Sequence, residues 1–152
     1  MKGKRMVVLA FLLFASAAVG YSYFVSSGEI YRSDSTGWTQ SEANAEIMRF
    51  ESEYDANLLQ ANAASEQAEI LEDTVKQLDE AISKLGGGTP YAVQLLQREK
   101  FIVEREQSVY AGEAAYYSEL AAEAKANQEG ILEACQTARF ACYNPGNQLG
   151  SG

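Results

Sequence analysis

The feature that most constrains the fold is a long stretch, from Thr39 to Leu85, without glycine or proline. Apolar or small residues recur in it at alternating steps of three and four, the heptad spacing of a coiled coil. This spacing predicts one long helix whose buried seam consists of Ile47, Phe50, Tyr54, Asn57, Ala61, Ala64, Ala68, Leu71, Val75, Leu78, Ile82 and Leu85. Thr39 and Glu42 have the spacing of a capping box, which predicts where this helix starts.

A second helix is expected after a short glycine-rich break. Three glycines at 86–88 end the first helix, because glycine readily adopts the left-handed conformation found after helix ends. Thr89 and Pro90 favour a new helix start, and so short a break predicts an antiparallel hairpin. We therefore expect an all-α chain, with a long antiparallel helical hairpin or coiled coil over residues 39–129 and its turn at 86–89.

Pairing the two helices outward from this turn brings small residues to the same level. Ala61, Ala63 and Ala64 then lie opposite Ala111, Gly112, Ala114 and Ala115, which predicts close helix packing there. Such packing would explain a mid-helix glycine, which otherwise costs a helix about 1 kcal/mol relative to alanine. The same register places Lys76 opposite Glu99.

Residues 1–25 predict a signal-anchor or a signal peptide. Three basic residues, Lys2, Lys4 and Arg5, precede a run without charges at 6–25. By the positive-inside rule the basic end stays in the cytoplasm. The bulk of the chain is therefore expected in the periplasm or another extracytoplasmic space.

Two alternatives remain open for this leader. As an anchor, residues 6–25 would form a helix about 30 Å long, which matches the hydrocarbon core of a membrane. As a signal peptide, residues 6–14 would be the apolar core, with a small-residue cleavage site after it. Tyr21, Tyr23 and Phe24 favour the anchor, because aromatic side chains prefer the headgroup level where a span ends.

Composition excludes several classes of function. The chain has 12 Lys and Arg against 21 Asp and Glu. Without the three basic residues of the leader, nine remain against 21, a net charge of −12 that repels nucleic acid. The sequence has no histidine, the commonest general base and transition-metal ligand, and no catalytic motif. We expect neither an enzyme nor a cofactor, and no small-molecule substrate.

Acidic clusters raise the question of a metal site. Glu69, Glu72 and Asp73 share one helical turn, so their carboxylates lie on one side of the helix. The sequence contains neither a calcium-binding loop nor the Glu-x-x-His pair of di-iron proteins. A solvated helix face is the expected role of these residues, and no metal is predicted.

Two segments flank the hairpin. Residues 26–38 are rich in serine and glycine, which is typical of a polar linker. Gly130 is expected to interrupt the second helix, so that residues 130–152 form a short further helix and a glycine-rich tail.

The C-terminal segment contains both cysteines, Cys135 and Cys142. In an oxidising compartment such a pair predicts a disulfide. Seven residues of helix would hold the two Cα atoms about 10 Å apart, too far for a bridge, so the helix must end between them. Two free thiols are the alternative. A thiol metal site is not expected, because two cysteines without histidine supply too few ligands for a transition metal.

The second helix carries more apolar surface than one partner helix covers. One row, expected to face the first helix, consists of Leu96, Val103, Tyr110, Tyr117 and Ala124. A neighbouring row, which we call the apolar stripe, consists of Leu95, Ile102, Val109 and Tyr116. Both rows together would suit a broad core face. A two-helix hairpin has no further element to cover the stripe, however, so the stripe predicts a contact surface for another polypeptide.

These features predict a non-enzymatic structural or assembly subunit. It would be a hairpin tethered to the inner (cytoplasmic) membrane, with its N-terminus in the cytoplasm, that joins or builds a larger envelope complex with other protein subunits or with copies of itself. The alternative is a cleaved, soluble periplasmic factor, either a holdase chaperone or a minor secretion or pilus component.

Overall fold

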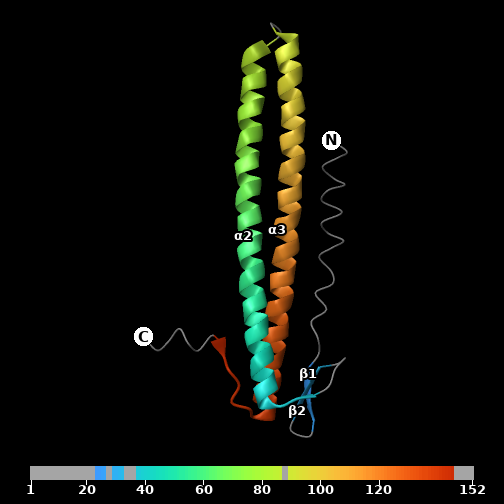
Figure 1. The fold of residues 1–152 in the computed structure, drawn as a ribbon, viewed down its shortest axis with the longest axis vertical. Coiled ribbons are helices and arrows are strands. Elements are labelled where there is room, and N and C mark those ends of the chain that lie inside the picture. Colours follow the sequence, from blue (N-terminus) through green and yellow to red (C-terminus); the bar gives the residue numbers. More distant parts are fainter. Residues whose placement is uncertain (1–22, 27–28, 33–36, 87–88, 146–152) are drawn as a thin grey trace, which may run out of the picture. The chain divides into compact units, whose positions relative to one another are not determined.

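The computed structural model describes residues 23–26, 29–32, 37–86 and 89–145 (Figure 1). Three short strands precede two long helices: β1 (Tyr23–Ser26), β2 (Glu29–Arg32), β3 (Gly37–Trp38), α2 (Gln40–Leu85) and α3 (Pro90–Ala138). The chain divides into two compact units, and both helices run through both of them. We call the residues up to Asn57 and from Glu119 onward the strand unit, and Leu58–Ser118 the hairpin unit.

The start of α2 is fixed by Thr39 and Glu42. The Thr39 backbone N–H and hydroxyl both donate to the Glu42 carboxylate, each at 2.8 Å. The Thr39 carbonyl accepts the first helical hydrogen bond, from the Ala43 N–H at 2.9 Å. The backbone bond, supported by the hydroxyl, lowers the pKa of Glu42. The carboxylate half of the predicted capping box is confirmed, while the hydroxyl bonds this carboxylate instead of a backbone N–H.

The predicted seam of α2 is its covered side. All of its members are buried or half-buried except Leu85, which lies at the end of the helix. Gly86 follows with φ +56°, the left-handed conformation in which glycine avoids the clash of a Cβ atom. Pro90 begins α3, and the Thr89 carbonyl accepts a hydrogen bond from the Val93 N–H at 3.2 Å.

In the hairpin unit, α2 and α3 run antiparallel beside each other (Figure 1). An ion pair links the two helices, with Lys100 Nζ at 2.5 Å from Asp79 Oδ1. The hydrogen bond to Asp79 raises the pKa of Lys100. The buried side chains of this unit are small or short: Ala61, Ala64 and Val103.

Two details of the predicted register are wrong in this unit. Lys76 is paired with Glu72 and Asp73 of its own helix, each at 3.0 Å, and not with Glu99. Carboxylates three or four residues away on one helix are within easy reach of a lysine. Gly112 lies in open space, since a Cβ atom there would meet nothing within 4 Å. It therefore marks no close helix contact.

Three antiparallel strands form a sheet in the order β1-β2-β3, and two of them, β2 and β3, lie within residues 26–38, which were expected to form a polar linker. β1 pairs with β2 from Tyr23–Arg32 to Ser26–Glu29, and Trp38 of β3 pairs with Ile30. Aromatic and β-branched residues favour strands, but the serines and glycines between them dominate the composition of so short a segment. The linker prediction is wrong, and the all-α class is corrected to a mostly helical chain with a small sheet.

β1 also corrects the end of the predicted membrane helix. That helix was to include Tyr23, Phe24 and Val25, which instead form a strand paired with β2. Tyr23 and Val25 pack against the protein core, a contact that their sequence neighbourhood does not reveal. The rest of the leader, residues 1–22, lies outside the described residues. Within the described ranges, neither helix has a window apolar enough to cross a membrane.

The core of the strand unit joins the sheet to both helices. Its buried members are Ile30, Ala43, Ile47, Phe50, Ala124, Ile131, Ala134 and Cys135. Tyr23 and Trp38 pack against them, with their ring centroids 5.9 Å apart. Gln128 is buried and forms a hydrogen bond between the helices, in which its Nε2 donates to the Ile47 carbonyl at 3.4 Å.

Helix α3 continues through Gly130 to Ala138, so the predicted interruption at Gly130 is wrong. A Cβ atom at this position would lie 2.6 Å from Cδ2 of the Tyr23 ring. The Tyr23 hydroxyl also donates to Asn127 Oδ1 at 3.5 Å, one turn earlier on α3. Glycine at position 130 therefore makes room for an aromatic ring from β1, at the cost of some helix propensity.

We expect Gly130→Ala to destabilise the strand unit by about 1 to 3 kcal/mol, because the new methyl group would push the Tyr23 ring away from α3. Gly112→Ala is the matched control in the same helix, and its open surroundings predict a gain of up to about 1 kcal/mol. Urea denaturation, followed by helical circular dichroism and by Trp38 fluorescence, measures both effects. A stabilising Gly130→Ala would show that the Tyr23 ring does not occupy this space.

Candidate protein-interaction surface

The four residues of the apolar stripe are exposed in the hairpin unit. Their exposed fractions are 50% for Leu95, 43% for Ile102, 59% for Val109 and 57% for Tyr116. Because they recur every seven residues on α3, they share one side of that helix. The exposure that an interaction surface requires is therefore present, and contact with another polypeptide stays a prediction.

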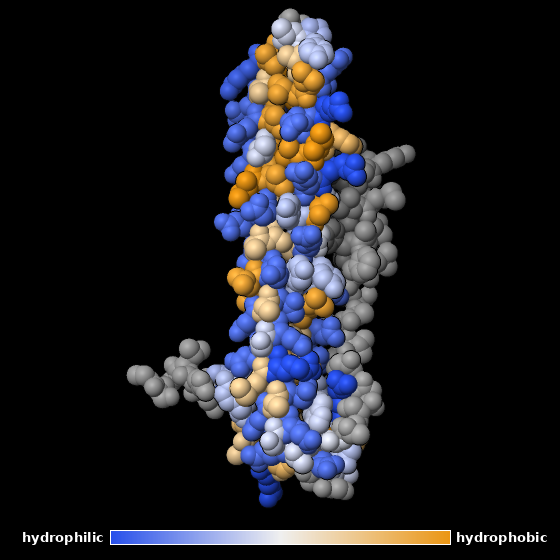
Figure 2. All heavy atoms as spheres, viewed as in Figure 1, coloured by the Kyte–Doolittle hydropathy of each residue, from blue (hydrophilic) through white to orange (hydrophobic). Residues whose placement is uncertain are grey.

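The neighbouring row of α3 is the one that α2 covers. Val103 is buried, Leu96 and Tyr117 are half-buried, and only Tyr110 is exposed, by about a third of its surface. One partner helix thus covers one row and leaves the next in contact with solvent. Figure 2 shows hydrophobic residues gathered on the part of the hairpin unit near its turn, with charged residues beside them.

Two further exposed aromatic residues on α3 were not predicted. Tyr91 lies four residues before Leu95 and Phe101 directly precedes Ile102, and both side chains are more than half exposed. Neither recurs at seven residues, so a search for heptad rows misses them. The spacing of Tyr91, four residues from a stripe member, was the signal that could have added it to the same side of the helix.

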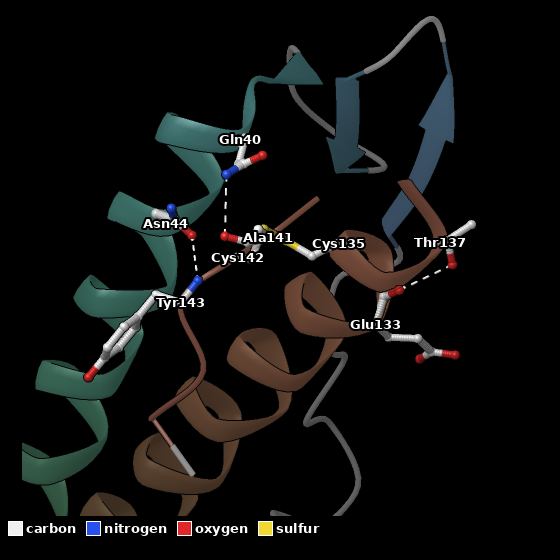
Figure 3. Close-up of a disulfide and its surroundings, with 8 residues drawn as sticks. All are labelled: Gln40, Asn44, Glu133, Cys135, Thr137, Ala141, Cys142 and Tyr143. Carbon is white, nitrogen blue, oxygen red and sulfur yellow. Dashed lines mark hydrogen bonds between the residues drawn. A yellow bond between two sulfur atoms is a disulfide. The ribbon is translucent and has the colours of Figure 1, made fainter. Parts of the chain in front are cut away.

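The predicted disulfide is confirmed. Cys135 and Cys142 are bridged, with their Cα atoms 6.0 Å apart (Figure 3). Helix α3 ends at Ala138, between the two cysteines, as the bridge requires. Arg139 follows in the left-handed conformation, with φ 58°, and the Phe140 N–H returns to the Cys135 carbonyl at 2.9 Å. This turn brings the chain back toward the helix it has just left.

The segment around Cys142 is held against the start of α2 (Figure 3). The Tyr143 backbone N–H donates to Asn44 Oδ1 at 2.7 Å, and Gln40 Nε2 donates to the Ala141 carbonyl at 3.3 Å. These two bonds connect residues about a hundred positions apart in the sequence, whereas the bridge joins residues only seven positions apart. They stabilise the strand unit and form no reactive centre.

The described part of the chain contains no candidate metal site. No group of three or more Cys, Asp or Glu side chains lies close enough there to hold a metal ion. Glu72 and Asp73 instead bind Lys76 and raise its pKa. An open hollow of about 440 Å³ between β1 and α3 has Glu133 as its only carboxylate, without a nucleophile and base in pair.

No protein-family model, no curated protein and no solved structure matches the chain.

Proposed function

We propose that this chain is a structural or assembly subunit without enzymatic activity. Its N-terminal segment tethers it to the cytoplasmic membrane, and the apolar stripe docks it into a larger envelope complex. The observation that carries this proposal is the exposure of Leu95, Ile102, Val109 and Tyr116 on one side of α3. Contiguous apolar surface of this kind is typical of sites that bind other proteins.

The energy available from the stripe is large enough to hold a complex. Full burial of one such side chain is worth about 1.5 to 3 kcal/mol, and about half of each is still exposed. Covering all four therefore contributes about 3 to 6 kcal/mol before the costs of association. Since 1.4 kcal/mol is a factor of about ten in affinity, loss of half the stripe should weaken binding about 10- to 100-fold.

Two observations support a location outside the cytoplasm. The Cys135–Cys142 disulfide is of the kind that persists in oxidising compartments. The basic residues Lys2, Lys4 and Arg5 before the uncharged run also fit an N-terminus that stays in the cytoplasm while the following chain leaves it.

We expect Ile102→Ser combined with Val109→Ser to release the protein from its complex while its helix content stays nearly unchanged. The physical reason is that both side chains are exposed in the isolated chain, so their loss removes intermolecular and not internal contacts. The measurement is the native size of the solubilised full-length protein, compared with its circular dichroism.

Leu59→Ser combined with Ile70→Ser is the matched control. These residues are also exposed and apolar but lie on α2, so the complex should stay intact. If the stripe variant unfolds, the stripe belongs to the internal core and the proposal fails. Recovery of a soluble form whose intact mass lacks about the first seventeen residues would favour the cleaved periplasmic factor.

A further inference from the structure

Charges of opposite sign border the apolar stripe on its two sides. Arg98 and Arg105 each follow a stripe residue by three positions, about 60° to one side of it. Glu99, Glu106 and Glu113 each follow one by four positions, about 40° to the other side. All five side chains are exposed. The stripe therefore has a basic edge and an acidic edge.

These border charges form no ion pairs within their own helix. No carboxylate lies three or four residues from Arg98 or Arg105, and the same positions around each border glutamate are all apolar or aromatic. Other basic residues do form ion pairs: Arg49, Lys76, Lys84, Lys100 and Lys125. Arg105 instead lies 6.0 Å from the Phe101 ring centroid. The charges nearest the stripe are thus available to another molecule.

The arrangement of the two edges selects one orientation for a second copy. If two copies of α3 meet stripe to stripe in parallel, a twofold axis along the helices brings the basic edge of each against the acidic edge of the other. If they meet antiparallel, basic faces basic and acidic faces acidic. Opposite charges facing each other stabilise such contacts and like charges destabilise them. The charge pattern therefore favours the parallel pair.

We propose that the apolar stripe is self-complementary and that its occupant is a second copy of this chain, parallel and in register. Leu95, Ile102, Val109 and Tyr116 then each pack against their own counterpart. Arg98 faces Glu99 of the second copy, and Arg105 faces Glu106 of the second copy. This inference rests on the proposed function and names the partner. Two chains tethered to one membrane by the same segment would also point in the same direction.

A crosslink at the end of the stripe tests the orientation. In a parallel pair, Leu95→Cys faces its own counterpart, whereas in an antiparallel pair it faces Tyr116, with the two copies of position 95 about 30 Å apart. We expect a short bismaleimide, applied to cells expressing the full-length chain, to give a covalent dimer from Leu95→Cys. Gln97→Cys, also exposed but on the other side of α3, should give none. The native cysteines form a disulfide and do not react.

Exchanging the border charges tests the source of the specificity. Arg98→Glu with Arg105→Glu makes both edges acidic, and Glu99→Arg with Glu106→Arg makes both edges basic at the two levels where the arginines lie. In the Leu95→Cys background, each variant alone should lose about tenfold or more of its self-crosslinking. Coexpression of the two variants should restore the yield as mixed dimers, because opposite edges then meet again. Equal self-crosslinking of Leu95→Cys alone and of the two charge variants in its background would overturn the charge argument and with it the inference.

The remaining outcomes separate this inference from the proposed function. A crosslink that appears only between Leu95→Cys and Tyr116→Cys means an antiparallel pair and overturns the inference. A photocrosslinker at Ile102 that captures only a different polypeptide also overturns it, but leaves the assembly function standing. Capture of no polypeptide by either probe overturns both.

Discussion

Ile131→Ala is expected to lower the free energy of unfolding of the strand unit by about 3 to 5 kcal/mol. Ile131 has no exposed surface and lies in the core cluster among residues from β2, α2 and α3. Its truncation removes buried apolar surface and leaves a cavity that the rigid helices cannot fill. Urea denaturation followed by Trp38 fluorescence measures the effect, because Trp38 is the sole tryptophan and packs against this same core.

Met48→Ala is the control for this substitution. Met48 lies on α2 in the same unit, and more than half of its side chain is exposed. Its replacement should change the stability by less than about 1 kcal/mol, since little burial is lost and alanine favours a helix. Similar losses for both variants would mean that Ile131 is not enclosed as described.

Replacing both cysteines by alanine is expected to destabilise the strand unit by about 2.5 kcal/mol, the chain-entropy contribution of a disulfide that closes so short a loop. The physical reason is that the reduced segment gains freedom in the unfolded chain and loses its attachment to the end of α3. Alanine is preferred to serine because Cys135 is buried and a hydroxyl there would lack a partner. The measurement is again urea denaturation, with and without a reductant.

Asn44→Ala separates the disulfide from the contacts that accompany it. This variant removes the hydrogen bond to the Tyr143 N–H but keeps the bridge, so a loss of about 1 kcal/mol is expected. A reductant should destabilise the unchanged protein as much as the cysteine substitutions do. It should not affect the variant in which both cysteines are replaced by alanine. If the reductant has no effect on the unchanged protein, the two thiols are free.

The two helices could be predicted because their signals are local and repeated. Heptad spacing over α2, a capping box at Thr39 and glycines after Leu85 all lie within a few residues of the feature they specify. The disulfide was predictable for a similar reason, since the short spacing of Cys135 and Cys142 requires only that the helix end between them.

The sheet and the continuation of α3 could not be predicted, because they depend on one distant contact. Gly130 has the local signature of a helix end, yet a ring from β1 occupies the space beside it. The strand residues, in turn, are short runs among serines and glycines that gain stability only when Ile30 enters the helical core. Neither Gly130 nor the strand residues can be assigned to this contact from their neighbours in the sequence.

The apolar stripe was predictable as a pattern, and so was the choice of which row faces α2, because pairing the helices outward from the turn assigns that place to the neighbouring row. Burial of Val103 beside the exposed Ile102 agrees with this assignment. The border charges follow from the same choice, because Arg98 and Glu99 flank the row that α2 leaves uncovered.

The contact between Tyr23 and α3 also sets the order in which parts of the chain can form during synthesis. Tyr23 and its hydrogen-bond partner Asn127 are 104 residues apart, so at ribosomal speeds the strand waits about 5 to 20 s for the helix it packs against. Leu58–Ser118 can close on itself before then. The first strand to be translated is therefore among the last elements to contact its partner helix. Until α3 has been made, the apolar side chain of Ile30 must be shielded from water by something other than its native core.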